Sequence, residues 1–233
     1  MVGVQPAIPT TIISFDVGQT LVELDLDFLA QRAGERGVEV LPQALVAASP
    51  AAWADFDSLV DRGIGHPWRQ LMASLLTRAG VREVGPLVEW LWEQQPAVNL
   101  FRKPIAPMVE LARDLRARGA TLVVTSNSEG RLAELLAEIG LADLFTVIVD
   151  SGRFGIEKPD RRIFEHAIAG LDADTPPVHI GDSWAADIAG ALAVGWRAIW
   201  YGRRAVPVDD PRVGVAPDAA AARATCERWG LLA

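Results

Sequence analysis

The chain of 233 residues is long enough for one large domain, or for a domain that carries an insertion, and half of its residues are hydrophobic. A formal net charge of -8 argues against nucleic acid and against an anionic membrane as the main partner, because both require clustered lysine and arginine. The single cysteine, Cys226, excludes an intramolecular disulfide. The sequence also has no membrane-length apolar run and no basic signal region, so it predicts a cytoplasmic protein.

The first predicted element is a buried strand from Thr11 to Phe15, which ends at Asp16. The next residues, Val17-Gly18-Gln19, read as a turn, and Thr20 then supplies a hydroxyl four residues after the acid. The pattern indicates a carboxylate that is presented at the end of a buried strand.

The segment from Val22 to Leu100 shows several amphipathic helical stretches but no run typical of a buried strand. We interpret residues 22–100 as an inserted helical cap, and residues 1–21 and 101–233 as the two parts of one core. Ligands of open parallel sheets bind at the carboxyl ends of the strands. An insertion directly after the first strand is therefore a candidate lid over the ligand site.

The remaining sequence alternates between short apolar runs and helical stretches, which predicts a parallel sheet with helices on its faces. Glycine follows each predicted helix, as is common at helix ends. The further predicted strands are Thr121 to Thr125, Val147 to Val149, Val178 to Ile180 and Arg197 to Trp200. The predicted helices are Val109 to Arg118, Arg131 to Ile139, Arg161 to Ala169 and Ile188 to Val194. The fold class is therefore α/β, with a Rossmann-like parallel sheet core and an inserted α-helical cap.

Chemically active residues follow several of these strands, and the carboxyl ends of parallel strands meet at one edge of a sheet. The set comprises Asp16, Thr20, Ser126, Asn127, Lys158, Asp182 and Asp187. Three acids at close quarters resist joint ionisation unless a divalent cation neutralises them, and oxygen ligands favour Mg²⁺. An ammonium group and hydroxyls can hold the oxygens of a phosphoryl group, while one acid accepts the phosphorus. Asp16 is the candidate for that acid.

The chain resembles the haloacid dehalogenase superfamily, whose members are mostly Mg²⁺-dependent phosphatases. The matching motifs are Asp16 to Thr20, Thr125-Ser126-Asn127, Lys158-Pro159, and Gly181-Asp182 with Asp187. The resemblance implies that Asp16 is the nucleophile and that Ser126 and Lys158 bind phosphate. We also expect Thr20 and Asn127 to bind the substrate. The resemblance further implies that Mg²⁺ is held by Asp16, Asp182 and the carbonyl of Gly18, with Asp187 supporting its waters.

Gly18 departs from the family's phosphatases, which carry a second Asp two residues after the nucleophile as general acid and base. Such a group accelerates a reaction by a factor of about 10² to 10⁴. Its absence is therefore expected to slow hydrolysis least for substrates with good leaving groups. The family's dehalogenases lack this Asp but need no metal, and the retained Asp182 and Asp187 argue against them. Phosphonoacetaldehyde hydrolase needs a cap lysine, and residues 17–101 contain none.

The predicted cap offers two further candidates. His66 could replace the missing base because imidazole titrates near neutrality, although a loop or capping role is the stronger interpretation. Arg69 could bind an anionic part of the substrate, or it could be a surface charge.

The sequence thus predicts a Mg²⁺-dependent hydrolase that removes phosphate from a small phosphorylated molecule through an aspartyl-phosphate intermediate. The alternative is a protein with little or no turnover that binds a phosphorylated ligand on the same scaffold, since fold does not fix function. Gly18 favours the alternative, whereas the presence of Asp16 favours the enzyme. The sequence indicates neither the substrate nor the oligomeric state.

Overall fold

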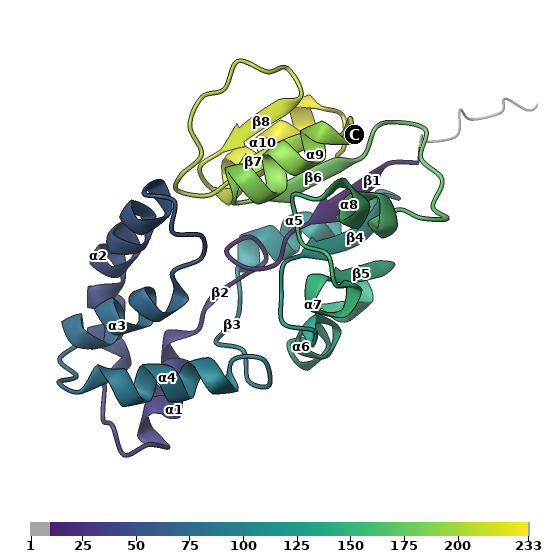
Figure 1. The fold of residues 1–233 in the computed structure, drawn as a ribbon. Coiled ribbons are helices and arrows are strands. Elements are labelled where there is room, and N and C mark those ends of the chain that lie inside the picture. Colours follow the sequence, from purple (N-terminus) through teal and green to yellow (C-terminus); the bar gives the residue numbers. More distant parts are fainter. Residues whose placement is uncertain (1–9, 233) are drawn as a thin grey trace, which may run out of the picture. The chain divides into compact units, whose positions relative to one another are not determined.

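The computed structural model describes residues 10–232, so residues 1–9 of the predicted core and Ala233 lie outside the described part. The chain forms two compact units (Figure 1). One unit is Leu24–Leu100, and the other combines the residues up to Glu23 with those from Phe101 onward. We refer to them as the helical unit and the α/β unit.

The α/β unit is built on a six-stranded sheet in the order β5-β4-β1-β6-β7-β8, and all neighbouring strands are parallel (Figure 1). Its strands are β1 Ile12–Phe15, β4 Thr121–Ser126, β5 Val147–Asp150, β6 Val178–Gly181, β7 Arg197–Tyr201 and β8 Val213–Ala216. The five predicted strands and the α/β class are confirmed. The edge strand β8 was not predicted, because its four residues include a glycine, which is uncommon inside strands. As an edge strand it is also less buried, with half-buried and buried residues in alternation.

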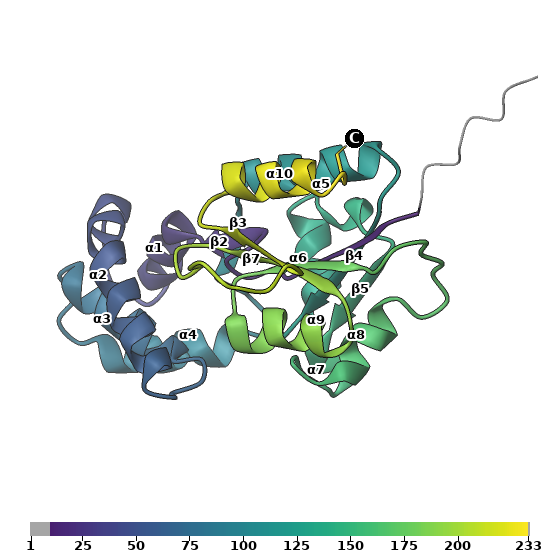
Figure 2. The same cartoon turned by 90° about the horizontal axis from the view of Figure 1, so that it is seen from above.

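Helices cover both faces of the sheet (Figure 2). One face carries α5 Ala106–Ala117, α6 Leu132–Glu138 and α10 Ala219–Arg228, and the other carries α8 Arg161–Ala167 and α9 Ala189–Ala193. Short helical segments are Ala142–Leu144, α7 Ser151–Phe154 and the π-helix Trp184–Ile188. In β1, Ile13 and Phe15 pack on the first face and Ile12 on the second. Both sides of β1 are therefore buried under helices, as is usual for a central parallel strand.

A two-stranded sheet of β2 Val22–Leu24 and β3 Phe101–Pro104 lies where the chain leaves the α/β unit and returns to it. The sequence shows no run typical of a buried strand between Val22 and Leu100, so β2 was not predicted. With three residues and a glutamate in the middle, β2 is too short to produce the apolar run that marks a buried strand.

The helical unit contains α1 Leu26–Gly34, α2 Pro42–Asp61, α3 Trp68–Arg78 and α4 Val84–Gln94. The first helix begins after Asp25, whose side chain accepts a hydrogen bond from the backbone N–H of Phe28 at 2.9 Å. The apolar stripe of α3 supplies much of the interior through Trp68, Leu71, Met72, Leu75 and Leu76. None of the helices within residues 10–232 combines the length and the apolar character needed to cross a bilayer.

Candidate active site at the carboxyl edge of the sheet

The strand ends bring the predicted core residues of the site together. Asp16 directly follows β1, Ser126 is the last residue of β4, and Asp182 directly follows β6. Lys158 precedes α8, and Asp187 lies in the π-helix that follows β6. Because β1 lies between β4 and β6, the acid after β1 occupies the centre of this edge.

One oxygen of the Asp16 carboxylate accepts hydrogen bonds from two side chains. Ser126 Oγ donates to Asp16 Oδ1 at 2.9 Å, and Lys158 Nζ donates to the same atom at 2.7 Å. The backbone N–H of Asp16 donates to the carbonyl of Ile180 at 2.9 Å, which fixes the residue against β6. Within the described residues both side-chain hydrogen bonds fall on Oδ1, so Oδ2 is the oxygen left for chemistry.

Lys158 joins two carboxylates. Its Nζ also donates to Asp187 Oδ1 at 2.5 Å, and its side chain is only 2% exposed. Burial opposes a charged amine, but the carboxylates of Asp16 and Asp187 outweigh it and raise the pKa of Lys158 above its usual value. The ammonium group therefore stays charged at neutral pH.

The three aspartates form a compact acidic cluster. Asp16, Asp182 and Asp187 each offer a carboxylate oxygen, and these oxygens lie within 4.8 Å of one another. Burial, followed by the charges of Asp16 and Asp187, raises the pKa of Asp182 well above its usual value. Burial likewise raises the pKa of Asp16, although the Lys158 charge opposes the shift. Without a cation the cluster therefore resists full ionisation.

Asn127 contacts the backbone of Lys158 through both ends of its amide. Its Nδ2 donates to the Lys158 carbonyl at 3.1 Å, and its Oδ1 accepts from the Lys158 N–H at 2.7 Å. Sequence reasoning expected Asn127 beside the substrate. In the structure its amide holds the segment that carries Lys158.

The loop after β1 carries Gly18, Gln19 and Thr20. A Cβ atom added to Gly18 would meet no atom within 4 Å, so a side chain at this position would enter open space. Gln19 has a positive φ of 57°, which is uncommon for a residue with a side chain. Thr20 is fully buried, and its hydroxyl has no hydrogen-bond partner among the described residues.

A cavity of about 210 Å³ adjoins this loop and the end of β6. Its lining includes Gln19, Asp182, Tyr201, Arg203 and Arg204. The space therefore opens directly beside one carboxylate of the acidic cluster.

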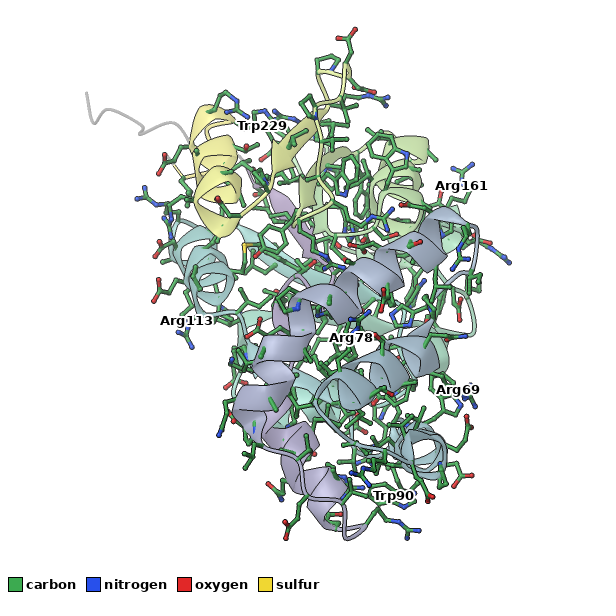
Figure 3. All side chains as sticks on the ribbon, turned by 90° about the vertical axis from the view of Figure 1, so that its left-hand side faces the viewer. Arg69, Arg78, Trp90, Arg113, Arg161 and Trp229 are labelled. Carbon is green, nitrogen blue, oxygen red and sulfur yellow. The ribbon has the colours of Figure 1, made fainter. Side chains whose placement is uncertain are left out.

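The two candidates from the predicted cap belong to the helical unit. His66 is exposed and packs edge-on against the ring of Phe56, with 5.4 Å between the ring centroids. Arg69, labelled in Figure 3, donates from Nε to both carboxylate oxygens of Glu89 at 3.0 Å and lies 4.3 Å over the ring of Trp92. The guanidinium is therefore engaged within its own unit.

Two buried polar residues near the site were not predicted from the sequence. Asp150 ends β5 and organises the loop after β4, and His179 lies in β6 and contacts Asp187. The available signals were an acid at the end of a strand and a polar residue inside the apolar run Val178-His179-Ile180. Both signals identify a buried polar group that needs a partner, but neither identifies that partner.

Asp150 accepts four hydrogen bonds. Its Oδ1 accepts from Ser128 Oγ at 2.8 Å and from the backbone N–H groups of Gly130 and Gly152 at 3.0 and 2.9 Å. Its Oδ2 accepts from the N–H of Leu132 at 2.9 Å. Asp150 therefore ties the loop that follows Ser126 to the neighbouring strand.

We expect Asp150→Ala to lower the free energy of unfolding by about 3 kcal/mol, because the buried N–H of Leu132 and the part-buried N–H groups of Gly130 and Gly152 lose their acceptor. Urea unfolding measures this loss. Asp218→Ala is the matched control, since Asp218 caps α10 at the surface with a single hydrogen bond to Ala221 at 2.8 Å. Its expected loss is about 1 kcal/mol, and equal losses in the two variants would contradict the structural role of Asp150.

Comparison with known proteins identifies the family. Residues 11–195 match the model of the haloacid dehalogenase-like hydrolases. Haloacid dehalogenase-like hydrolase domain-containing protein 3 from Bos taurus is 34% identical over 200 residues, which cover 79% of this chain and 78% of the relative. The phosphoserine phosphatase of Thermus thermophilus is 34% identical over 178 residues, covering 72% of this chain and 71% of the relative.

A solved structure shows the same fold. The HAD-hydrolase YfnB from Bacillus subtilis, bound to magnesium, superposes with a TM-score of 0.65 at 18% sequence identity. The match covers 97% of this chain and 99% of that chain. The family model and the relative from Bos taurus show that the chain belongs to the haloacid dehalogenase-like hydrolases.

Proposed function

We propose that the protein is a Mg²⁺-dependent phosphatase of a small phosphorylated molecule and that Asp16 is its nucleophile. The observation that carries the proposal is the convergence of Ser126 Oγ and Lys158 Nζ on Asp16 Oδ1, which leaves Oδ2 for attack. The similarity to a phosphoserine phosphatase supports the reaction class. A cavity of about 210 Å³ lies beside Asp182 of the acidic cluster.

In the proposed reaction, Asp16 Oδ2 attacks phosphorus and the bond to the leaving oxygen breaks, which gives an aspartyl phosphate and an alkoxide or phenoxide that takes its proton from water. Water then attacks the phosphorus, inorganic phosphate departs and the carboxylate is restored. An ammonium group has three N–H donors, and Lys158 uses two of them on Asp16 and Asp187. The third is available for an oxygen of the transferring phosphoryl group.

The residues fit a magnesium ion. The cluster offers oxygen ligands only, and burial raises the pKa of both Asp16 and Asp182, which supports a cation as the partner of these carboxylates. Both oxygens of Asp187 are already engaged, since Oδ1 contacts Lys158 and His179, and Oδ2 accepts a hydrogen bond from the Ser183 N–H. We therefore propose that Asp16, Asp182 and the Gly18 carbonyl hold the ion, with Asp187 behind them. When bound, the cation neutralises the carboxylates and polarises the phosphoryl oxygens.

Hydrolysis of 4-nitrophenyl phosphate with and without Mg²⁺ tests this proposal, because its leaving group barely needs a proton. We expect metal-dependent turnover and an aspartyl phosphate that can be trapped at Asp16 by acid quenching and located by peptide mass. Turnover that persists fully in EDTA, or a phosphoryl group on another residue, would overturn the proposal.

A second candidate function is a protein that binds a phosphorylated ligand without turning it over, and Gly18 is the observation that favours it. Such a protein would bind orthovanadate or phosphate together with Mg²⁺, yet leave 4-nitrophenyl phosphate intact. The two functions are therefore separated by the same assay combined with a binding measurement.

We expect the affinity for Mg²⁺ to fall as the pH falls. The pKa of Asp182 is raised in the metal-free protein, chiefly by burial, so the cation must displace a proton wherever this carboxyl is protonated. Affinity then increases by up to about tenfold per pH unit below that pKa and levels off above it. Calorimetric titrations between pH 5.5 and 8, in buffers of different ionisation enthalpy, measure both the affinity and the released proton. An affinity independent of pH, with no proton released, would contradict the assignment of Asp182.

A further inference from the structure

A chain of buried hydrogen bonds crosses the three central strands beneath the site. Thr125 Oγ1 in β4 lies 3.0 Å from Ser14 Oγ in β1, and Ser14 Oγ lies 2.9 Å from His179 Nδ1 in β6. His179 Nε2 then lies 3.0 Å from Asp187 Oδ1. All three strand residues are fully buried, and Ser14 and His179 are direct partners in the strand register. This series of hydrogen bonds therefore ends on the Asp187 carboxylate, which also pairs with Lys158.

The chemistry of the groups decides which atom donates and which accepts in each of these hydrogen bonds. Burial opposes ionisation of Asp187, but the Lys158 charge and the His179 hydrogen bond hold the pKa of its carboxyl well below the usual value. A carboxylate only accepts hydrogen bonds, so His179 Nε2 must carry the hydrogen. Burial lowers the pKa of His179 despite the nearby carboxylate, so the ring is neutral and Nδ1 is an acceptor. Ser14 therefore donates to Nδ1 and accepts from Thr125.

Asp187 is held closely on every side. Its Oδ2 accepts from the Ser183 N–H at 2.9 Å. A Cβ atom on Gly181 would lie 2.3 Å from Asp187 Cγ, so the carboxyl group packs directly against the glycine backbone. Its Oδ1 is shared between His179 and Lys158, whose Nζ in turn contacts Asp16. A shift of Asp187 would therefore move the ammonium group that touches Asp16.

We propose that His179 is a positioning residue for the phosphatase reaction proposed above, on which this inference rests. Its Nε2–H holds Asp187 Oδ1, and through Asp187 it fixes Lys158 against Asp16. A residue that only filled the core beside Phe164, whose ring centroid lies 5.4 Å from that of the imidazole, would be apolar. Burying an imidazole instead requires partners for both ring nitrogens, and the structure supplies them in Ser14 and Asp187.

Two amide variants separate positioning from packing. The amide of glutamine reaches about where His Nε2 lies, and the amide of asparagine reaches about where Nδ1 lies. His179→Gln therefore keeps a donor for Asp187, whereas His179→Asn keeps only the contact with Ser14. We expect His179→Asn to lower kcat for 4-nitrophenyl phosphate by about 10- to 100-fold with a smaller change in KM, and His179→Gln to restore most of kcat. His166→Gln, at an exposed position on α8, is the control and is expected to change nothing.

Equal kcat values in the two variants and the natural protein, or equal losses in both variants, would overturn the inference. The imidazole tautomer gives a readout that does not need turnover, and the chain has only three histidines to assign. Nitrogen-15 NMR of the natural protein should show hydrogen on His179 Nε2, and a ring with hydrogen on Nδ1 alone would overturn the inference. Absence of turnover in the natural protein would instead refute the phosphatase function, and the tautomer would still decide whether His179 donates to Asp187.

Discussion

Asp16→Asn is expected to reduce turnover of 4-nitrophenyl phosphate by more than about 10³-fold while the protein stays folded. An amide of the same size can still accept hydrogen bonds from Ser126 and Lys158, which contact Asp16 Oδ1 at 2.9 and 2.7 Å. It cannot supply the anionic oxygen that attacks phosphorus. Lys158 keeps its ion pair with Asp187 in the variant, so the loss falls on the nucleophile and not on the charge of the ammonium group.

Single-turnover kinetics and the trapped phosphoryl group measure this effect together. Asp143→Asn is a matched control, because Asp143 lies exposed in the short helix Ala142–Leu144 and the variant should behave as the natural protein. Thermal unfolding checks that Asp16→Asn retains the fold. If that variant hydrolysed the substrate at the natural rate, Asp16 would not be the nucleophile.

Much of the edge of the sheet could be predicted from sequence because it follows from topology. Once the alternation of apolar runs and helices indicates parallel strands, the residues after each strand must gather at one edge. Asp16, Ser126 and Asp182 come together for that reason, and their convergence depends on no detail of side-chain conformation. Lys158 and Asp187 could be placed at the same edge because Lys158 precedes α8 and Asp187 lies in the helical segment that follows β6.

The contacts beneath this edge could not be predicted in the same way. His179 and Ser14 are 165 residues apart, and their contact depends on the register of β1 against β6 and on one choice of side-chain rotamer. Asn127 shows the same limit, since an amide after a strand can face a ligand or hold a nearby backbone with equal chemistry. In this fold it holds the backbone of Lys158. The pairing of buried polar groups is thus decided by packing, and the pattern of residues only shows that a partner must exist.

Gly18→Asp is expected to raise turnover of an alkyl phosphate by about 10² to 10⁴, because it supplies a general acid for the leaving oxygen and a base for water. The site has room for the change, since a Cβ atom on Gly18 meets nothing within 4 Å. Its φ also lies outside the positive range that L residues avoid, so the added side chain is expected to cause no backbone strain. The backbone carbonyl proposed as a metal ligand is unchanged.

The expected gain depends on the leaving group. O-phosphoserine needs a proton on its leaving oxygen, whereas 4-nitrophenyl phosphate barely does, so the ratio of their kcat/KM values should rise in Gly18→Asp. Gly18→Asn has the same size without an acid or base and should leave that ratio unchanged. A rise in both variants, or in neither, would contradict the assignment of position 18 to proton transfer.

The same ratio tests whether His66 serves as a substitute base in the natural protein. If it does, His66→Ala lowers turnover of O-phosphoserine in the natural background, and the loss largely disappears once Gly18→Asp supplies the acid and base directly. Equal losses in both backgrounds would indicate that His66 has only a structural role in the helical unit, where its ring packs against Phe56. Because the two groups would act on the same proton, their effects cannot be additive, and the double variant measures that coupling.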